Sequence, residues 1–375
     1  MGEKDSIQGA EIGSHSIVVN KNEQLFFTLL RNALWNITED IPKKIAHRTS
    51  SAILRLAEEQ TVSGLIIDAL IRNDIRMEQQ TVFEAYGMIE QIKEANKEVN
   101  KELLSFAELM EAKGVDYAVF KGQTVATLYP DPLLRMPGDI DFLVFDNQKA
   151  QSIFLNKWGI CLPDIFIEKE VAFEHNGVTY ELHTQLITFR CRKHQRYWES
   201  MMRRPHQSAV LVDGKEIKTI PPNIYAVYVF AHLFFHFIRE GVGLRQLCDW
   251  AIILDRYKDK IEPSQLADDL DGLGMKKAYR AFGGVLTTHL GLKSFPLTMD
   301  EKDLKESERI SKDILHYGNF GKPSRKVQQT GWKFKMETMC RTVRNCCKYF
   351  RLAPAEIGMI VPRLIVLNVK LIFSK

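Results

Sequence analysis

Apolar residues recur at helical spacing through the first part of the chain. From Glu23 to about Lys113, leucine and isoleucine return every three or four positions, charged residues fill the other faces, and Gly and Pro are almost absent. This pattern predicts an N-terminal helical region over residues 23–113, with about four helices. Residues 1–22 lack the periodicity, and we expect them to form a flexible arm.

Short apolar runs replace the helical pattern at residue 114. Residues 115–120 (VDYAVF) and 139–145 (DIDFLVF) are rich in strand-forming residues, and a Pro-bracketed loop lies between them. Further along, alternating segments flank Asn176-Gly177 and Asp213-Gly214, and such dipeptides favour two-residue hairpin turns. The sequence therefore predicts a core of strands and helices over residues 114–222, including two hairpins.

Helical periodicity returns after Pro221-Pro222 and continues through residues 223–375. The predicted order is therefore helices, a small mixed β-sheet, and helices again. We expect an α+β fold in which the sheet forms the catalytic or ligand-binding core between two helical regions.

Charge is divided unevenly along the chain, although the net charge of +4 is unremarkable. Residues 322–375 hold 12 Lys+Arg and 2 Asp+Glu, a balance of +10, whereas the rest hold 39 and 45, a balance of −6. Within this basic tail, residues 357–373 are apolar and contain Arg363 and Lys370. The segment could lie on an anionic membrane surface or pack onto the helical region, and we favour packing. The acidic body and the lack of an RNA-binding motif argue against a nucleic-acid partner.

Six cysteines without a CxxC pair indicate reduced thiols rather than a disulfide scaffold or a zinc site. No run of 18 apolar residues is present, and the N-terminus has no apolar core typical of a signal peptide. We expect a cytoplasmic protein, with peripheral contact at the inner membrane face as the alternative.

Candidate chemistry begins at Asp139-Ile140-Asp141. In a strand, residues i and i+2 point to the same face, so both carboxylates project together while Ile140 turns to the core. Two carboxylates a few ångströms apart repel each other unless a cation lies between them, and Mg²⁺ is the usual cation. Taken alone, this pair is more often two unrelated surface acids.

A second polar face lies about 40 residues downstream. The same alternation places Glu181, His183 and Gln185 on one face of a strand. If this strand lies beside the Asp139–Phe145 strand, Glu181 joins the two aspartates, and three carboxylates are suited to holding two divalent ions for phosphoryl chemistry. Upstream, Lys121-Gly122 ends a strand and opens a short helix, where glycine permits close approach of a phosphate and Lys121 adds a positive charge.

Together, these residues give the chain a family resemblance. Residues 119–144 (VFKGQTVATLYPDPLLRMPGDIDFLV) resemble the signature of the nucleotidyltransferase superfamily that includes DNA polymerase β. More narrowly, the chain is similar to the bacterial family of uncharacterised nucleotidyltransferases over about residues 25–260. The elements that carry this similarity are Lys121-Gly122, Leu128-Tyr129, Arg135, Asp139-Ile140-Asp141, Glu181-Leu182-His183, His232/His236 and Leu244-Arg245-Gln246-Leu247-Cys248-Asp249.

The resemblance implies transfer of a nucleoside monophosphate from a nucleoside triphosphate, such as ATP, to an acceptor, with release of pyrophosphate. Asp139 and Asp141 would bind two Mg²⁺ ions, for which Mn²⁺ could substitute, and Glu181 would complete the site and help deprotonate the acceptor hydroxyl. The turn implied to hold the triphosphate comprises Lys121, Gly122, Gln123 and Thr124. Gln123 departs from the superfamily, which usually has Ser or Gly there. The acceptor would be a small molecule, a sugar or a protein.

Two arginines and an aspartate leave alternatives open. Arg135 could neutralise phosphate or anchor its loop to a core carboxylate. Arg245 and Asp249, four residues apart on a helix, could form a salt bridge, or Arg245 could contact nucleotide or acceptor.

Three histidines also have two interpretations. His183 shares its face with Glu181 and could support the metal site or serve as a hydrogen-bonded structural residue. His232 and His236 share a helix face but lack the glutamate of an HExxH zinc motif, so we favour packing against the cleft over ligation.

An alternative function is a non-catalytic NTP-binding or regulatory relative, in which the carboxylates persist without turnover. A template-independent polymerase is a third possibility, disfavoured by the acidic body.

Overall fold

The computed structural model of the chain describes residues 21–39, 41–162, 170–204, 208–321, 332–360 and 362. Residues 1–20 of the expected arm and nearly all of the apolar segment 357–373 beyond residue 360 lie outside these residues. The last two residues of the expected arm, 21 and 22, are instead helical. No helix in these ranges combines the length and hydrophobicity needed to cross a bilayer.

A four-stranded mixed sheet lies in the middle of the chain, with the order β1-β2-β4-β3. Its strands are β1 (Tyr117–Phe120), β2 (Ile140–Val144), β3 (Glu170–His175) and β4 (Val178–His183). β2 is antiparallel to β1 and parallel to β4, and β3 and β4 form an antiparallel hairpin. A second hairpin consists of β5 (Ser208–Val212) and β6 (Lys215–Thr219). Both hairpins turn at the predicted dipeptides, Asn176-Gly177 and Asp213-Gly214.

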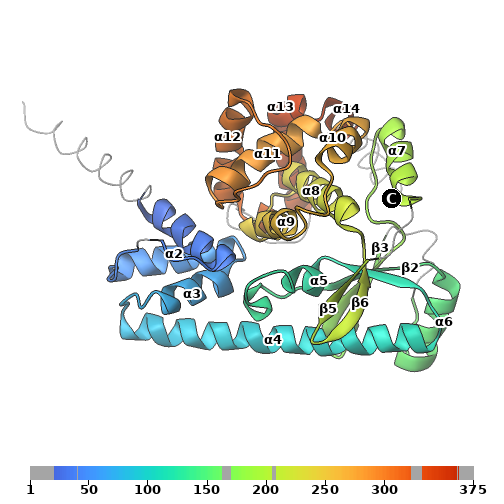
Figure 1. Cartoon of the computed structure of the whole chain (residues 1–375), viewed down its shortest axis with the longest axis horizontal. Helices are drawn as coiled ribbons and strands as arrows, with labels where there is room; N and C mark the ends of the chain where they lie inside the picture. The colour runs from blue at the N-terminus through green and yellow to red at the C-terminus, as the bar shows by residue number, and fades with distance from the viewer. Residues whose placement is uncertain are drawn as a thin grey trace, which may run out of the picture.

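One long helix connects the N-terminal helices to the sheet. Residues 21–35 are helical, and α2 (His47–Glu59), α3 (Ser63–Arg72) and the 34-residue α4 (Gln79–Ala112) follow. At 1.5 Å per residue, α4 is roughly 50 Å long. It runs beneath both α2–α3 and the sheet (Figure 1).

The remaining helices surround the sheet or lie on its other side. A short α5 (Gly122–Ala126) and the 3₁₀ turn η1 (Pro132–Leu134) connect β1 to β2, while α6 (Asn147–Trp158) follows β2 and α7 (Arg192–Met202) follows β4. Beyond β6, the helices gather on the side of the sheet opposite α4 (Figure 1). They are α8 (Pro222–Arg239), α9 (Leu244–Arg256), α10 (Pro263–Gly272), α11 (Lys276–Thr288), α12 (Glu301–Tyr317), α13 (Trp332–Tyr349) and α14 (Pro354–Gly358), with 3₁₀ turns η2 (Asn319–Gly321) and η3 (Phe350–Leu352). The α+β fold with helices on both sides of a small mixed sheet is as predicted.

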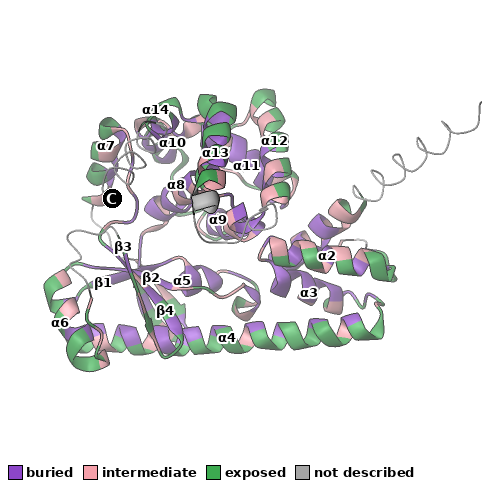
Figure 2. Ribbon diagram, turned by 180° about the vertical axis from the view of Figure 1, so that it is seen from behind, coloured by how far each residue is buried: buried purple, intermediate pink, exposed green. Residues whose placement is uncertain are grey.

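Both faces of the sheet are covered by helices, so each side chain of β2 faces one of two different helical layers. Ile140, Phe142 and Val144 of β2 share a core with the C-terminal half of α4 and with α6. Leu143 belongs to the larger core that includes α8 and α9. Figure 2 shows the outward side of α4 exposed, whereas α8 is buried almost throughout. By strand alternation, Asp141 therefore faces α8.

Candidate active site

The predicted carboxylates meet at one cavity. Asp141 on β2 lies directly opposite Glu181 on the parallel neighbour β4, which is the pairing that the sequence analysis required. Asp139 comes just before β2, since the strand begins one residue later than expected, yet it lines the same cavity. The cavity has a volume of about 290 Å³ and lies between the sheet, α8 and α9.

An unusual backbone conformation at Lys121 holds its side chain close to Asp141. Its φ of 60° and ψ of −153° lie in a region that non-glycine residues rarely adopt, at a cost of about 1–3 kcal/mol. The backbone N–H of Lys121 donates to the Tyr225 hydroxyl (2.7 Å), and its carbonyl accepts from the Thr124 hydroxyl (2.7 Å). The ammonium consequently lies 2.8 Å from Asp141 Oδ1, where it lines the cavity.

His183 is the second hydrogen-bond partner of Asp141. Its Nε2 lies 2.8 Å from Asp141 Oδ1 and 3.6 Å from a Glu181 oxygen. Burial lowers the pKa of His183, but its hydrogen bonds to Asp141 and Glu181 outweigh burial, so the net shift is upward. His183 thus contacts both candidate ligands.

The two aspartates differ in their electrostatic surroundings. Burial raises the pKa of Asp141, but Lys121 and His183 more than offset burial, so this pKa lies below its usual value. For Asp139, burial and then the nearby charges of Asp141 and Glu181 raise the pKa to about 6. The excess negative charge of the site is therefore concentrated around Asp139. A divalent cation bound there would reduce the repulsion between Asp139, Asp141 and Glu181.

The turn after Lys121 differs from the expectation. Gly122 packs so closely that an added Cβ would lie 3.0 Å from the Asp139 carbonyl oxygen. The Gln123 side chain turns into the core, where its amide nitrogen donates to the backbone of Asn96 (3.4 Å) and to the side chain of Asn100. The Thr124 hydroxyl is engaged by Lys121 and Tyr225. Of the four predicted turn residues, Lys121 and Gly122 line the cavity, whereas the side chains of Gln123 and Thr124 stabilise the turn from behind.

Arg135 is an anchor rather than a free phosphate ligand. Its guanidinium forms two 2.8 Å bonds to the carboxylate of Asp249, which also accepts from the Tyr129 hydroxyl at 2.7 Å. Both charged side chains are buried. The loop before Asp139 is therefore fixed to α9. Asp249 pairs with Arg135, so the Arg245–Asp249 salt bridge, one of the two alternatives left open by the sequence, does not form.

Arg245 consequently has no carboxylate partner among the residues described. Its Nη1 donates to the carbonyls of Met136 (3.3 Å) and Pro137 (3.2 Å), and its buried Nε has no hydrogen-bond partner. Burial, followed by the nearby charge of Arg135, lowers the pKa of Arg245. The cavity wall therefore carries a cation that forms no direct ion pair among the described residues, although the charges of Asp249 and Asp139 act on it from nearby.

The two histidines of α8 line the opposite wall. The ring centroids of His232 and His236 are 4.4 Å apart, and the His236 ring also lies against Phe320. Burial, then the positive charges of Lys121, His236 and His183, lower the pKa of His232 well below its usual value. His232 is therefore neutral at physiological pH and can accept or donate a hydrogen bond in the cavity.

Some residues at the site were not expected from the sequence. Tyr225 supports the strained Lys121 backbone, and its place on the same helical face as His232 could have indicated this role. Glu170, at the start of β3, and Phe320, in η2, line the cavity through tertiary packing that has no local sequence signal.

The donor atoms suit a divalent cation. Ligand atoms of Asp141, Glu181 and His183 all lie within 4.8 Å of one another, and the Asp139 carboxylate faces the same cavity. Carboxylate oxygens are the donors that Mg²⁺ prefers. The Lys121 and His183 contacts at Asp141 Oδ1 occupy part of that donor set, and cation binding requires the Lys121 contact to give way.

One family model matches most of the residues that form this cavity. No protein with a curated description matches the chain. The crystal structure of an antigenic nucleotidyltransferase-like protein from Paracoccidioides brasiliensis aligns with 52% of this chain and 94% of its own, at 15% identity and a TM-score of 0.29. The model of a family described as uncharacterised nucleotidyltransferase matches residues 47–291, which include every residue of the cavity except Phe320. Because this match spans well over half of the chain, the protein belongs to the uncharacterised nucleotidyltransferase family.

Proposed function

We propose that this protein is a Mg²⁺-dependent nucleotidyltransferase. It transfers a nucleoside monophosphate from an NTP to a hydroxyl or phosphate acceptor and releases pyrophosphate. Membership of the family supports nucleotidyl transfer. The observation that carries the proposal is the pairing of Asp141 with Glu181 across β2 and β4, beside Asp139 and Lys121 in one cavity.

In this proposal, Asp139, Asp141 and Glu181 hold two Mg²⁺ ions, and Mn²⁺ can substitute. The ions would supply charge neutralisation for the triphosphate and for the oxygens of the reacting phosphorus. Lys121, released from Asp141, pairs with phosphate oxygens. His183 keeps a hydrogen bond to the carboxylate pair and fixes its orientation.

The reaction is an in-line displacement at the α-phosphorus. An acceptor oxygen forms a new P–O bond, the bond from the α-phosphorus to the bridging oxygen of the β-phosphate breaks, and pyrophosphate leaves. When the acceptor is a hydroxyl, Glu181 takes its proton. An ionised phosphate acceptor has no proton to remove.

Arg245 is proposed to bind the triphosphate or an anionic acceptor. Arg245 forms no direct ion pair, and its buried Nε has no hydrogen-bond partner, which a phosphate oxygen would supply. Arg135 does not share this role because Asp249 already satisfies its guanidinium in a bidentate pair.

The experiment is a label-transfer assay with the full-length protein, Mg²⁺ and each of the four common ribonucleoside triphosphates, labelled at the α- or the γ-phosphate. Fractionated cell extract supplies acceptors. Transfer from α-labelled but not γ-labelled NTP supports the proposal if Asp139→Asn and Asp141→Asn abolish it. Asp259→Asn, an exposed carboxylate away from the cavity, is the matched control. If the protein binds NTP but transfers no label in any fraction, the non-catalytic relative is indicated instead.

A further inference from the structure

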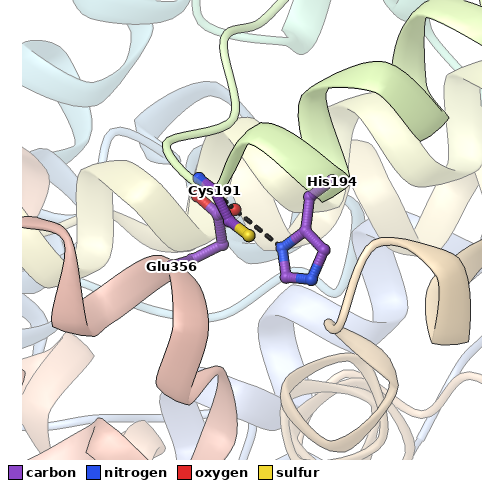
Figure 3. Close-up of side chains that lie close together, drawn as sticks. All are labelled: Cys191, His194 and Glu356. Carbon is purple, nitrogen blue, oxygen red and sulfur yellow. Dashed lines mark hydrogen bonds and ion pairs between the residues drawn. The ribbon is translucent and has the colours of Figure 1, made fainter.

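A second cluster of metal-ligand side chains lies at the N-terminus of α7, outside the cavity described above. Cys191 precedes the helix, His194 lies in its first turn, and Glu356 comes from α14, more than 160 residues further along the chain (Figure 3). One ligand atom from each of the three residues lies within 4.8 Å of the other two. The family signature and the proposed reaction use none of them.

Glu356 is fixed in place and removed from water. Its side chain is fully buried (0% exposed), and its two carboxylate oxygens accept hydrogen bonds from the backbone N–H groups of Arg190 (2.7 Å) and Cys191 (3.0 Å). These bonds orient the carboxylate toward the start of α7. Such outer contacts are typical of carboxylates that serve as metal ligands.

The orientation of His194 distinguishes a metal site from a catalytic relay. Its Nδ1 lies 2.7 Å from Glu356 Oε1, and Figure 3 shows the Cys191 sulfur beside this same bond. The Nε2 edge packs against Gly274 (φ +65°), where an added Cβ would lie 2.7 Å from Nε2. A Cys–His–Glu relay needs one imidazole nitrogen for the thiol and the other for the carboxylate. Here the thiol and the carboxylate converge on one nitrogen.

We propose that Cys191, His194 and Glu356 form a Zn²⁺ site. Thiolate, imidazole and carboxylate are the donors that Zn²⁺ takes, and Cys191-x-x-His194 places one donor just before α7 and another in its first turn. Tetrahedral bonds of about 2.0–2.1 Å to N and O separate these donors by about 3.3 Å, so His194 has to move by only about half an ångström.

Binding exchanges protons for the metal. The hydrogen between Nδ1 and Glu356 moves to Nε2, so that the neutral imidazole binds the ion through Nδ1, and Cys191 binds as the thiolate after its proton is released to solvent. The ion would tie α14, in the basic C-terminal region, to α7. Three protein ligands leave the fourth position for water or an added ligand, and the partly exposed Cys191 places this position toward solvent.

The direct test is Co²⁺ titration of the reduced, chelator-treated full-length protein. A thiolate bound to Co²⁺ gives a charge-transfer band in the near ultraviolet. No cysteine is among the described residues that line the candidate active site, so Co²⁺ bound there would not produce this band. We expect the band to saturate at one equivalent and to disappear in Cys191→Ser. It should persist in Cys347→Ser, a matched exposed cysteine on another helix.

A second measurement uses the unaltered protein, so that an unfolded variant cannot obscure the result. Zn²⁺ should slow alkylation of Cys191, followed by mass spectrometry, by about tenfold or more, because the bound thiolate is no longer a free nucleophile. Alkylation of the exposed Cys340 and Cys347 should not change, and excess Mg²⁺ should not protect Cys191. If no thiolate band forms at stoichiometric Co²⁺ and Zn²⁺ leaves Cys191 labelling unchanged, the cluster is only a hydrogen-bonded helix cap and the proposal is wrong.

Discussion

Replacing Asp249 by Asn should destabilise the protein by about 3–5 kcal/mol, because the change leaves the buried Arg135 guanidinium without a counter-charge. The two side chains are only 5% and 10% exposed, and they share two 2.8 Å hydrogen bonds. An exposed pair such as Lys97–Glu94, with side chains 55% and 63% exposed, contributes far less because water screens both charges. Burial therefore determines the size of the expected loss.

The assay is equilibrium urea unfolding followed by tryptophan fluorescence, to which the buried Trp250 beside Asp249 contributes. Arg135→Met and Asp249→Asn are measured singly and together. The double variant should lose less stability than the sum of the two single variants' losses, because Arg135→Met removes the positive charge that Asp249→Asn leaves without a partner. Glu94→Gln serves as the control and should change the unfolding free energy by at most about 0.5 kcal/mol.

A loss below about 1 kcal/mol in Asp249→Asn would refute this reasoning. Additive losses in the double variant would also contradict it. Either result would mean that Arg135 is not paired with Asp249 in solution and is available to bind phosphate.

Three further variants test the candidate site. Burial and the neighbouring carboxylates raise the pKa of Asp139 to about 6, so its ionisation destabilises the metal-free protein as the pH rises from about 4 to 6. In the presence of chelator, Asp139→Asn should therefore raise the Tm at about pH 7.5 but not below about pH 4. An unchanged Tm at the higher pH would contradict this prediction. Gly122→Ala places a Cβ 3.0 Å from the carbonyl oxygen of Asp139, at a φ of +44° that alanine rarely adopts. The rate of nucleotidyl transfer should therefore fall about tenfold to hundredfold, while circular dichroism shows that the protein is still folded. Arg245→Met should weaken ATP binding measured by calorimetry about tenfold, with partial recovery in Arg245→Lys, and an unchanged Kd would exclude Arg245 from the phosphate site.

The backbone of the site could be predicted from the sequence because each step depends on local rules. Strand alternation put Asp139 and Asp141 on one side of Ile140, and the Asn176-Gly177 turn fixed the hairpin that carries Glu181. The partners of polar side chains could not be predicted in this way. Asp249 lies one helical turn from Arg245, but it pairs with Arg135, which is 114 residues away in sequence. Tertiary packing, rather than helical spacing, determines which cation reaches that carboxylate.

The helical regions on either side of the sheet are part of the site's scaffold, because they hold the loop before Asp139 from two directions. From α4, the side-chain amide of Asn96 donates to the carbonyls of Leu133 (2.9 Å) and Arg135 (2.8 Å). From α9, Arg245 donates to the next two carbonyls, and Asp249 holds the Arg135 side chain. Asp139 follows this doubly held loop, so its position depends on α4 and α9 being correctly docked. Isolating residues 114–222 would remove both supports, so the strands alone do not define the carboxylate geometry.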